Sequence, residues 1–145
     1  MASKGFGSKK NVGPKKVKQA PPGWTQVGRT SDLVENKPIK AVEVGRNAVV
    51  VVRSGDEFFC TDAKSTAYQF PLVDANLVEV EGKPAIECPL DGTVYDLRTG
   101  KVLEWCPKNN VIRAFLGKLK EKDKPIKLQT YPLSLGEDGE IYVKL

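Results

Sequence analysis

Short runs of β-forming residues, each ended by a glycine-containing turn, occupy most of the chain from Gly23 onward. The turn signals are Gly45-Arg46-Asn47, Ser54-Gly55-Asp56, Gly82-Lys83-Pro84, Arg98-Thr99-Gly100 and Gly136-Glu137-Asp138-Gly139. Strands at such regular intervals predict an all-β fold, a small antiparallel sandwich or barrel. Residues 47–53 (NAVVVVR) are a continuous β-branched run, which is typical of a strand buried on both faces.

One stretch departs from the strand pattern. Residues 109–124 place apolar side chains at helical intervals, namely Val111 or Ile112, Phe115 or Leu116, and Leu119. Asn109 or Asn110 is the candidate N-cap, and the lysines near the end suit the negative pole of a helix. We predict one short inserted helix at about 109–121, whose role is either to cover an open end of the barrel or to bind a partner.

The basic character of the chain lies in its first residues. Residues 1–20 hold six lysines and no acid, whereas the rest holds 17 basic and 18 acidic residues. We therefore expect residues 1–22 to be an extended basic arm, disordered alone, and residues 23–145 to be the folded domain. The arm is a solvated tail, or it binds a protein, lipid or nucleic acid; a basic domain face for nucleic acid is not indicated. The candidate partner-binding residues are Lys9, Lys10, Lys15, Lys16, Lys18 and Trp24.

The absence of histidine from the sequence narrows the possible chemistry. A Ser-His-Asp or Cys-His nucleophile and the usual catalytic zinc sites are excluded, so we expect no enzyme activity and no catalytic residue. The three cysteines, Cys60, Cys88 and Cys106, form no CxxC pair, and we expect buried thiols or one disulfide between loops. No apolar run is long enough to span a bilayer, and no signal-peptide core is evident, so any membrane association is expected to be peripheral.

Two loop sequences suggest a family. Residues 88–92 (CPLDG) are followed by Tyr95-Asp96-Leu97 and a Thr99-Gly100 turn, and residues 65–72 read STAYQFPL. The order of these elements resembles that of the Rieske domain over residues 23–145. In that family, two loops each give one cysteine and one histidine to a 2Fe-2S cluster. The resemblance implies a Rieske-like antiparallel β-sandwich or barrel.

The same resemblance identifies four degenerate ligand positions. It places Ser65 and Ala67 at the cysteine and histidine of the first loop, and Cys88 and Asp91 at those of the second. Because one ligand in four is retained, the chain resembles a cluster-free member, and we expect neither a 2Fe-2S cluster nor any metal site. We expect Tyr68, Phe70, Leu72 and Val73 to fill the space, the alternative being surface aromatics on a mobile loop. We expect Asp91 to accept hydrogen bonds in its own turn.

The resemblance extends to plastid Rieske-like proteins associated with photosynthetic complexes. It implies a non-catalytic docking or structural protein, an auxiliary subunit or assembly factor of a photosystem, located at the thylakoid membrane surface. Its partners would be protein subunits of that membrane-associated complex, bound through the basic arm. The alternative is a redox protein that acts through its cysteine thiols or an unorthodox iron–sulfur cluster.

Overall fold

The computed structural model describes residues 20–145. Most of the predicted arm, residues 1–22, therefore lies outside the described residues, and so do five of the candidate partner-binding residues, Lys9, Lys10, Lys15, Lys16 and Lys18. Trp24 is described and half-buried. Its backbone N–H donates to the carbonyl of Pro21 at 2.9 Å, which closes a turn ahead of the first strand.

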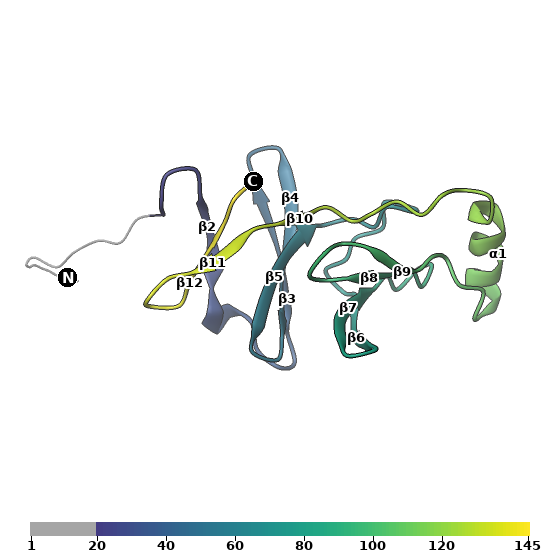
Figure 1. Ribbon diagram of the computed structural model, residues 1–145, viewed down its shortest axis with the longest axis horizontal. Helices are drawn as coiled ribbons and strands as arrows, with labels where there is room; N and C mark the ends of the chain where they lie inside the picture. Colours follow the sequence, from purple (N-terminus) through teal and green to yellow (C-terminus); the bar gives the residue numbers. More distant parts are fainter. Residues whose placement is uncertain (1–19) are drawn as a thin grey trace, which may run out of the picture.

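The described residues form three antiparallel sheets, which confirms the predicted all-β fold (Figure 1). The first has the order β10 (Thr130–Tyr131), β5 (Glu57–Asp62), β4 (Asn47–Ser54) and β3 (Ile39–Val44). The second consists of β11 (Leu133–Leu135), β12 (Glu140–Val143) and β2 (Thr25–Arg29), and a short 3-10 turn, Thr30–Asp32, follows β2. The third consists of β6 (Asn76–Val80), β7 (Lys83–Glu87), β8 (Val94–Asp96) and β9 (Val102–Glu104).

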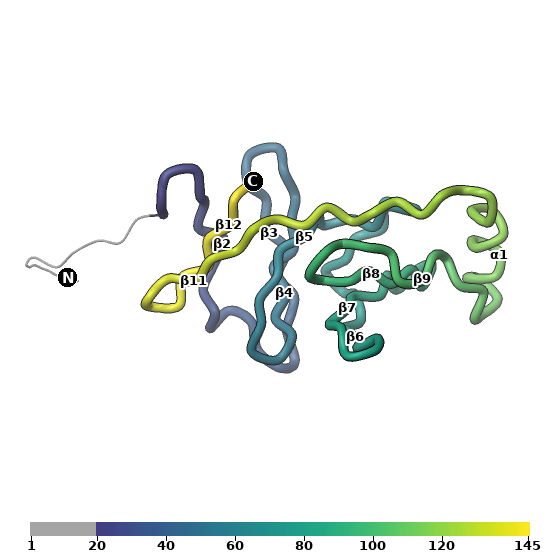
Figure 2. The backbone as a smooth tube through the Cα atoms, viewed as in Figure 1, coloured from purple at the N-terminus to yellow at the C-terminus, as the bar shows by residue number. Residues whose placement is uncertain are grey.

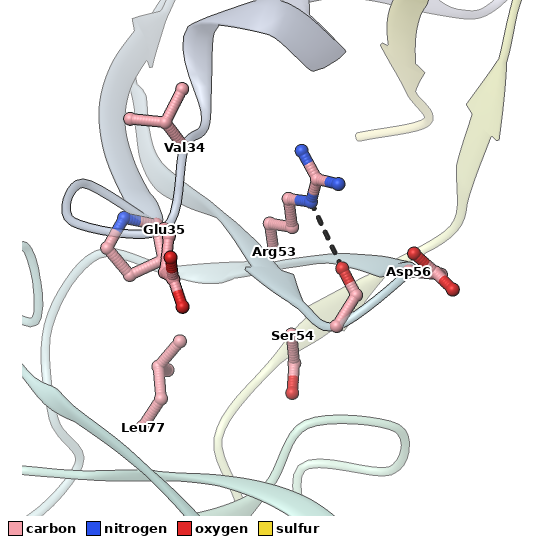
Figure 3. Close-up of a pocket in the computed structure, with 8 residues that line it drawn as sticks. Val34, Glu35, Arg53, Ser54, Asp56 and Leu77 are labelled. Atoms are coloured by element: carbon pink, nitrogen blue, oxygen red, sulfur yellow. Dashed lines mark hydrogen bonds between the residues drawn. The ribbon is translucent and has the colours of Figure 1, made fainter.

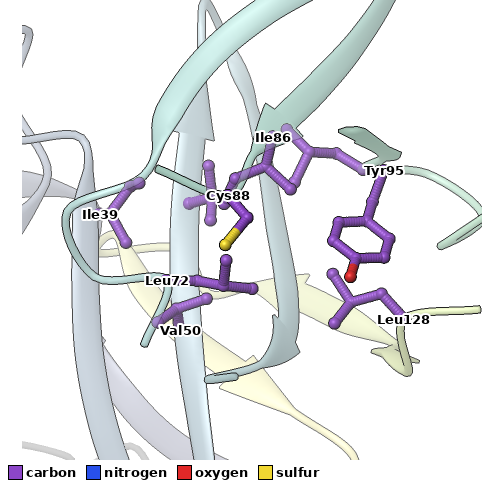
Figure 4. Close-up of a cluster of buried hydrophobic side chains, with 9 residues drawn as sticks. Ile39, Val50, Leu72, Ile86, Cys88, Tyr95 and Leu128 are labelled. Atoms are coloured by element: carbon purple, nitrogen blue, oxygen red, sulfur yellow. The ribbon is translucent and has the colours of Figure 1, made fainter. Parts of the chain in front are cut away.

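Strand β4 separates two hydrophobic cores, because its successive side chains point to opposite faces. Val49 and Val51 enter a cluster with Val27, Leu33, Cys60, Ile141 and Val143. Val50 and Val52 enter the other, with Ile39, Leu72, Ile86, Cys88, Tyr95, Leu97 and Leu128 (Figure 4). The prediction that residues 47–53 form a strand buried on both faces is confirmed for these four valines, each of which is at most 1% exposed.

The single helix of the described residues, α1, spans Val111–Lys120 and lies within the predicted range. Its N-cap is Asn110, whose side-chain oxygen accepts a hydrogen bond from the backbone N–H of Arg113 at 2.8 Å. Figure 1 places α1 at one end of the long axis, beyond the β6–β9 sheet. Figure 2 shows residues 121–129 returning from it toward β10, and on this path Leu128 donates a backbone hydrogen bond to Gly100.

Candidate functional site

The first loop, between β5 and β6, is closed by Ser65. Its backbone N–H donates to the carbonyl of Phe70 at 2.9 Å, and its hydroxyl accepts from the Phe70 N–H at 3.1 Å. Ser65 and Ala67 are both buried. Ser65 thus holds the loop together, whereas the methyl group of Ala67 offers no donor or acceptor.

The second loop, between β7 and β8, is closed by Asp91. The Oδ1 atom accepts a hydrogen bond from the backbone N–H of Thr93 at 2.9 Å, which confirms the predicted turn. The Oδ2 atom of this fully buried side chain has no hydrogen-bond partner among the described residues. Gly92 has φ +80°, and a Cβ there would lie 2.9 Å from Arg113 and from Pro107. The turn therefore requires glycine for both its backbone conformation and its close packing.

Tyr95 links the first loop to β8, the strand that follows the second loop. It lies on β8 and is fully buried, and its phenol oxygen accepts a hydrogen bond from the backbone N–H of Thr66 at 2.9 Å. The Thr66 hydroxyl lies 2.8 Å from the same oxygen and donates to the carbonyl of Ile126 at 2.6 Å. Side-chain hydrogen bonds therefore join the first loop to β8 and to the segment that returns from α1.

Cys88 lies in the hydrophobic core rather than at a surface. Figure 4 shows it among Leu72, Ile86 and Tyr95. Burial raises the pKa of its thiol. The backbone N–H groups of Asp91 and Leu90 and the Ser65 hydroxyl oppose this shift, whereas the charge of the Asp91 carboxylate adds to it.

The other two thiols are also buried, and the pKa of each is raised. Burial raises the pKa of Cys106, whose sulfur accepts a 3.5 Å hydrogen bond from the Thr93 hydroxyl. Burial, together with the charge of Asp62, raises the pKa of Cys60 to about 12. All three cysteines are free and buried, which confirms the first of the two sequence-based alternatives. A reactive thiol needs exposure and a lowered pKa, and none of the three has either.

Arg113 is the main residue that the sequence did not single out. From α1 it donates to the Pro89 carbonyl at 3.2 Å and to Asn109 at 3.2 Å, and it lies 3.4 Å from a Glu87 oxygen. It therefore holds the second loop against the helix. The sequence did contain a sign of this role, because Arg113 is the one arginine in the lysine-rich stretch 108–127. Arginine can contact several acceptors at once.

A depression lies elsewhere on the surface of the protein. It is lined by Val34, Glu35, Pro38, Arg53, Ser54, Gly55, Asp56 and Leu77 (Figure 3). The Arg53 side chain already donates to the carbonyls of Gly55 at 3.0 Å and Leu33 at 3.1 Å. Because its cation is used in closing the β4–β5 turn, we assign no binding role to this depression.

Comparison with known families gives one match. The sequence matches the model of a family described as "Rieske-like [2Fe-2S] domain" over residues 23–144. No curated protein sequence matches the chain.

Solved structures support the same fold. The E. coli protein NirD is 14% identical with a TM-score of 0.61, and the match covers 83% of this chain and 94% of that one. The ferredoxin of carbazole 1,9a-dioxygenase from Nocardioides aromaticivorans is 21% identical with a TM-score of 0.60, covering 83% and 95%. A chain from the complex of reduced oxygenase and oxidised ferredoxin in carbazole 1,9a-dioxygenase is 24% identical with a TM-score of 0.59, covering 83% and 92%.

The family match corrects one prediction. The sequence predicted that no 2Fe-2S cluster is bound, but the family is one of [2Fe-2S] domains. The prediction of no cofactor is therefore wrong at the level of the family.

The residues present differ from the family's ligand set of two cysteines and two histidines. The four positions offer a hydroxyl (Ser65), a methyl group (Ala67), a thiol (Cys88) and a carboxylate (Asp91). Within residues 20–145, no three cysteine, aspartate or glutamate side chains are grouped so as to hold a metal ion. These residues do not fit the cluster, and we derive no chemical step from it.

Proposed function

Because the chain belongs to the Rieske-like [2Fe-2S] domain family, we propose that it acts as a non-catalytic docking subunit of a larger, membrane-associated protein complex. The observation that carries this proposal is the burial of Ser65, Cys88 and Asp91. Because all three side chains are buried, none of them offers a reactive group at the surface of the described residues.

The hydrogen bonds at the two loops favour a fixed shape. Ser65 closes the first loop, Asp91 closes the second, and Tyr95 bonds Thr66 of the first loop to β8. Arg113 extends the same network to α1. A surface built on such cross-links keeps its shape before binding, which lowers the entropy cost of docking.

One similar chain comes from a complex of an oxygenase with a ferredoxin, which supports a protein partner for this chain. We propose in addition that the complex is a photosystem, with the protein at the thylakoid membrane surface of a plastid. This finer proposal is supported by the resemblance of the chain as a whole to plastid Rieske-like proteins. The basic arm and Trp24 are the proposed partner contacts.

Electron transfer is the second candidate, and the family match favours it, since the family is one of [2Fe-2S] domains. The thiol form of this role would need Cys60, Cys88 or Cys106 to react. All three are buried with raised pKa values, so a thiol mechanism would require the loops to open first.

The deciding experiment isolates the full-length protein, carrying an affinity tag, from its native membranes under anaerobic conditions. We expect it in a complex at fixed stoichiometry with photosystem subunits, and iron and acid-labile sulfide are measured on the same sample. A monomer that elutes alone from the mildest extraction would contradict the docking proposal. Stoichiometric iron and sulfide, with a reversible spectroscopic change on reduction, would establish the electron-transfer role instead.

A Trp24→Ala variant with the same tag tests the proposed contact. We expect less complex to be recovered with this variant. A matched control is Tyr142→Phe, which alters an aromatic side chain on β12 while keeping its ring. Equal recovery with Trp24→Ala and Tyr142→Phe would remove Trp24 from the docking surface.

A further inference from the structure

The apolar side chains of α1 face away from the protein. Val111 is 87% exposed, Ile112 63%, Phe115 65% and Leu119 61%. These four residues, which we call the outer stripe, lie at helical spacing on one face. Helices of this kind normally bury such a face against the core, so the outer stripe is an unpartnered surface in the described part of the chain.

The opposite side of α1 is held by backbone contacts. The Tyr68 hydroxyl donates to the Leu116 carbonyl at 2.5 Å, and the Trp105 indole donates to the Lys120 carbonyl at 3.3 Å. Gly117 is the one buried residue of the helix, and a Cβ there would lie 2.5 Å from the Cys106 carbonyl oxygen. The helix therefore stays on the body without using the outer stripe.

Charge is concentrated beside the outer stripe. Residues 108–127 contain seven basic and two acidic residues, a net charge of +5. The other described residues contain ten basic and sixteen acidic residues, a net charge of −6. Lys118, Lys122 and Lys124 are exposed and form no salt bridge with any described residue. The end that carries α1 is thus electropositive on an otherwise acidic body.

We propose that α1 binds an anionic lipid surface, with the outer stripe inserted between headgroups and the neighbouring lysines on the phosphates. An exposed apolar face flanked by lysines is the pattern of interfacial helices, and lysine chains extend toward headgroups while their stems stay apolar. No described helix is long and apolar enough to cross a membrane. This lipid contact goes beyond the docking function and does not depend on which complex is bound.

Position in the fold favours lipid over an acidic protein. α1 lies at the end of the long axis (Figure 1), so the outer stripe can reach a flat surface before the rest of the body does. Its apolar surface continues onto the second loop, because Val111 and Ile112 line one depression with Pro89 and Leu90. A fluid bilayer accepts such an apolar surface without a shaped receptor.

The test uses full-length protein and vesicles of phosphatidylcholine with or without phosphatidylglycerol. We expect sedimentation with the anionic vesicles only, weakened by added salt. Replacing three stripe residues (Ile112→Ser, Phe115→Ser, Leu119→Ser) is expected to weaken binding about tenfold or more. The matched control is Val34→Ser with Leu135→Ser, two exposed apolar residues elsewhere on the body, and this variant is expected to bind like the unmodified protein.

A second measurement separates α1 from the basic arm, which could also bind anionic lipid. Because the native thiols are buried, a Phe115→Cys variant carries one accessible thiol for an environment-sensitive dye. We expect a blue shift of the dye on anionic vesicles, and no shift for the same dye on Leu135→Cys. Full binding by the stripe variant, no blue shift at position 115, or no binding of the unmodified protein to anionic vesicles would each overturn the proposal. The vesicles hold no protein, so these outcomes leave the docking function untouched.

Discussion

The phenol hydroxyl of Tyr68 donates a hydrogen bond to the backbone carbonyl of Leu116, with 2.5 Å between the two oxygens. This contact joins the first loop to α1 across 48 positions of sequence. The Lys120 ammonium lies 5.1 Å from the centre of the same ring, at a distance suited to a cation–π contact. Tyr68 is therefore a support for the helix, and its loss has a local consequence that can be measured.

Tyr68→Phe should loosen α1 while leaving the sheets intact. The variant removes one hydrogen bond, worth about 1 kcal/mol, from an element that the outer stripe does not anchor. We expect faster amide exchange in residues 111–120 and unchanged exchange in β4, measured by hydrogen–deuterium exchange. Tyr142→Phe serves as the control. Equal protection of α1 in the two variants would show that the contact does not hold the helix.

Gly117→Ala should destabilise the protein, although alanine is normally the better helix former by about 1 kcal/mol. A Cβ at this position would meet the Cys106 carbonyl oxygen at 2.5 Å, and such overpacking costs about 1–3 kcal/mol. Denaturant unfolding measures the loss. The exposed Lys118→Ala is the matched control and should be nearly neutral. A more stable Gly117→Ala would mean that α1 moves away from the body at little cost.

Asp91→Asn and Asp91→Ala should differ in a way that isolates the turn. Asparagine keeps the oxygen that accepts from Thr93, whereas alanine removes it. We expect Asp91→Ala to be less stable than Asp91→Asn by about 1 kcal/mol. Unfolding free energies of both variants, measured in one buffer, give this difference. Equal stabilities would assign no role to the side-chain hydrogen bond.

Stability should fall in alkaline solution. The pKa of Cys60 rises from its ordinary value of 9.0 to about 12 in the folded protein, so the unfolded chain releases the thiol proton first. The contribution of the Cys60 thiol to the free energy of unfolding is complete below about pH 9. It is lost as the pH rises toward about 12, by about 1 kcal/mol per pH unit. Tyr131, whose pKa burial and Asp62 also raise to about 12, acts in the same direction.

The Cys60→Ala variant tests the origin of this slope. Its unfolding free energy should fall less steeply than that of the unmodified protein between about pH 9 and about pH 11. Cys106→Ala is a useful comparison, because Cys106 has a raised pKa as well but lies outside both core clusters. An identical slope in Cys60→Ala would mean that the thiol of Cys60 does not contribute.

The sequence was sufficient for the strands because local patterns encode them. The four valines of β4 are all buried, although they point to opposite faces of the sheet. A β-branched run in which apolar and polar residues do not alternate therefore predicts a strand that lies between two cores. The N-cap of α1 was also predictable, since Asn110 precedes the apolar periodicity. Helical periodicity, however, locates an apolar face without saying what covers it. The outward direction of Phe115 depends on Tyr68 and Trp105, which are distant in sequence.

The candidate site was predictable in part for a similar reason. Ser65, Cys88 and Asp91 could be placed by loop sequences of a recognisable form, and all three are buried. The hydrogen bond between Thr66 and Tyr95 could not be found that way, because the two residues are 29 positions apart and neither stands at one of the four ligand positions. Arg113 contacts Pro89 across 24 positions, and only the fold brings them together.

The manner in which α1 is attached also bears on how such a protein can diversify. Its backbone carbonyls, Gly117 and the Arg113 side chain make the contacts with the body, and none of these contacts involves Ile112, Phe115 or Leu119. Substitutions at Ile112, Phe115 and Leu119 are thus nearly uncoupled from folding, and selection can alter this face without a compensating change in either core. A few substitutions on the exposed face of α1 can therefore change what the helix binds while the fold of the domain stays the same.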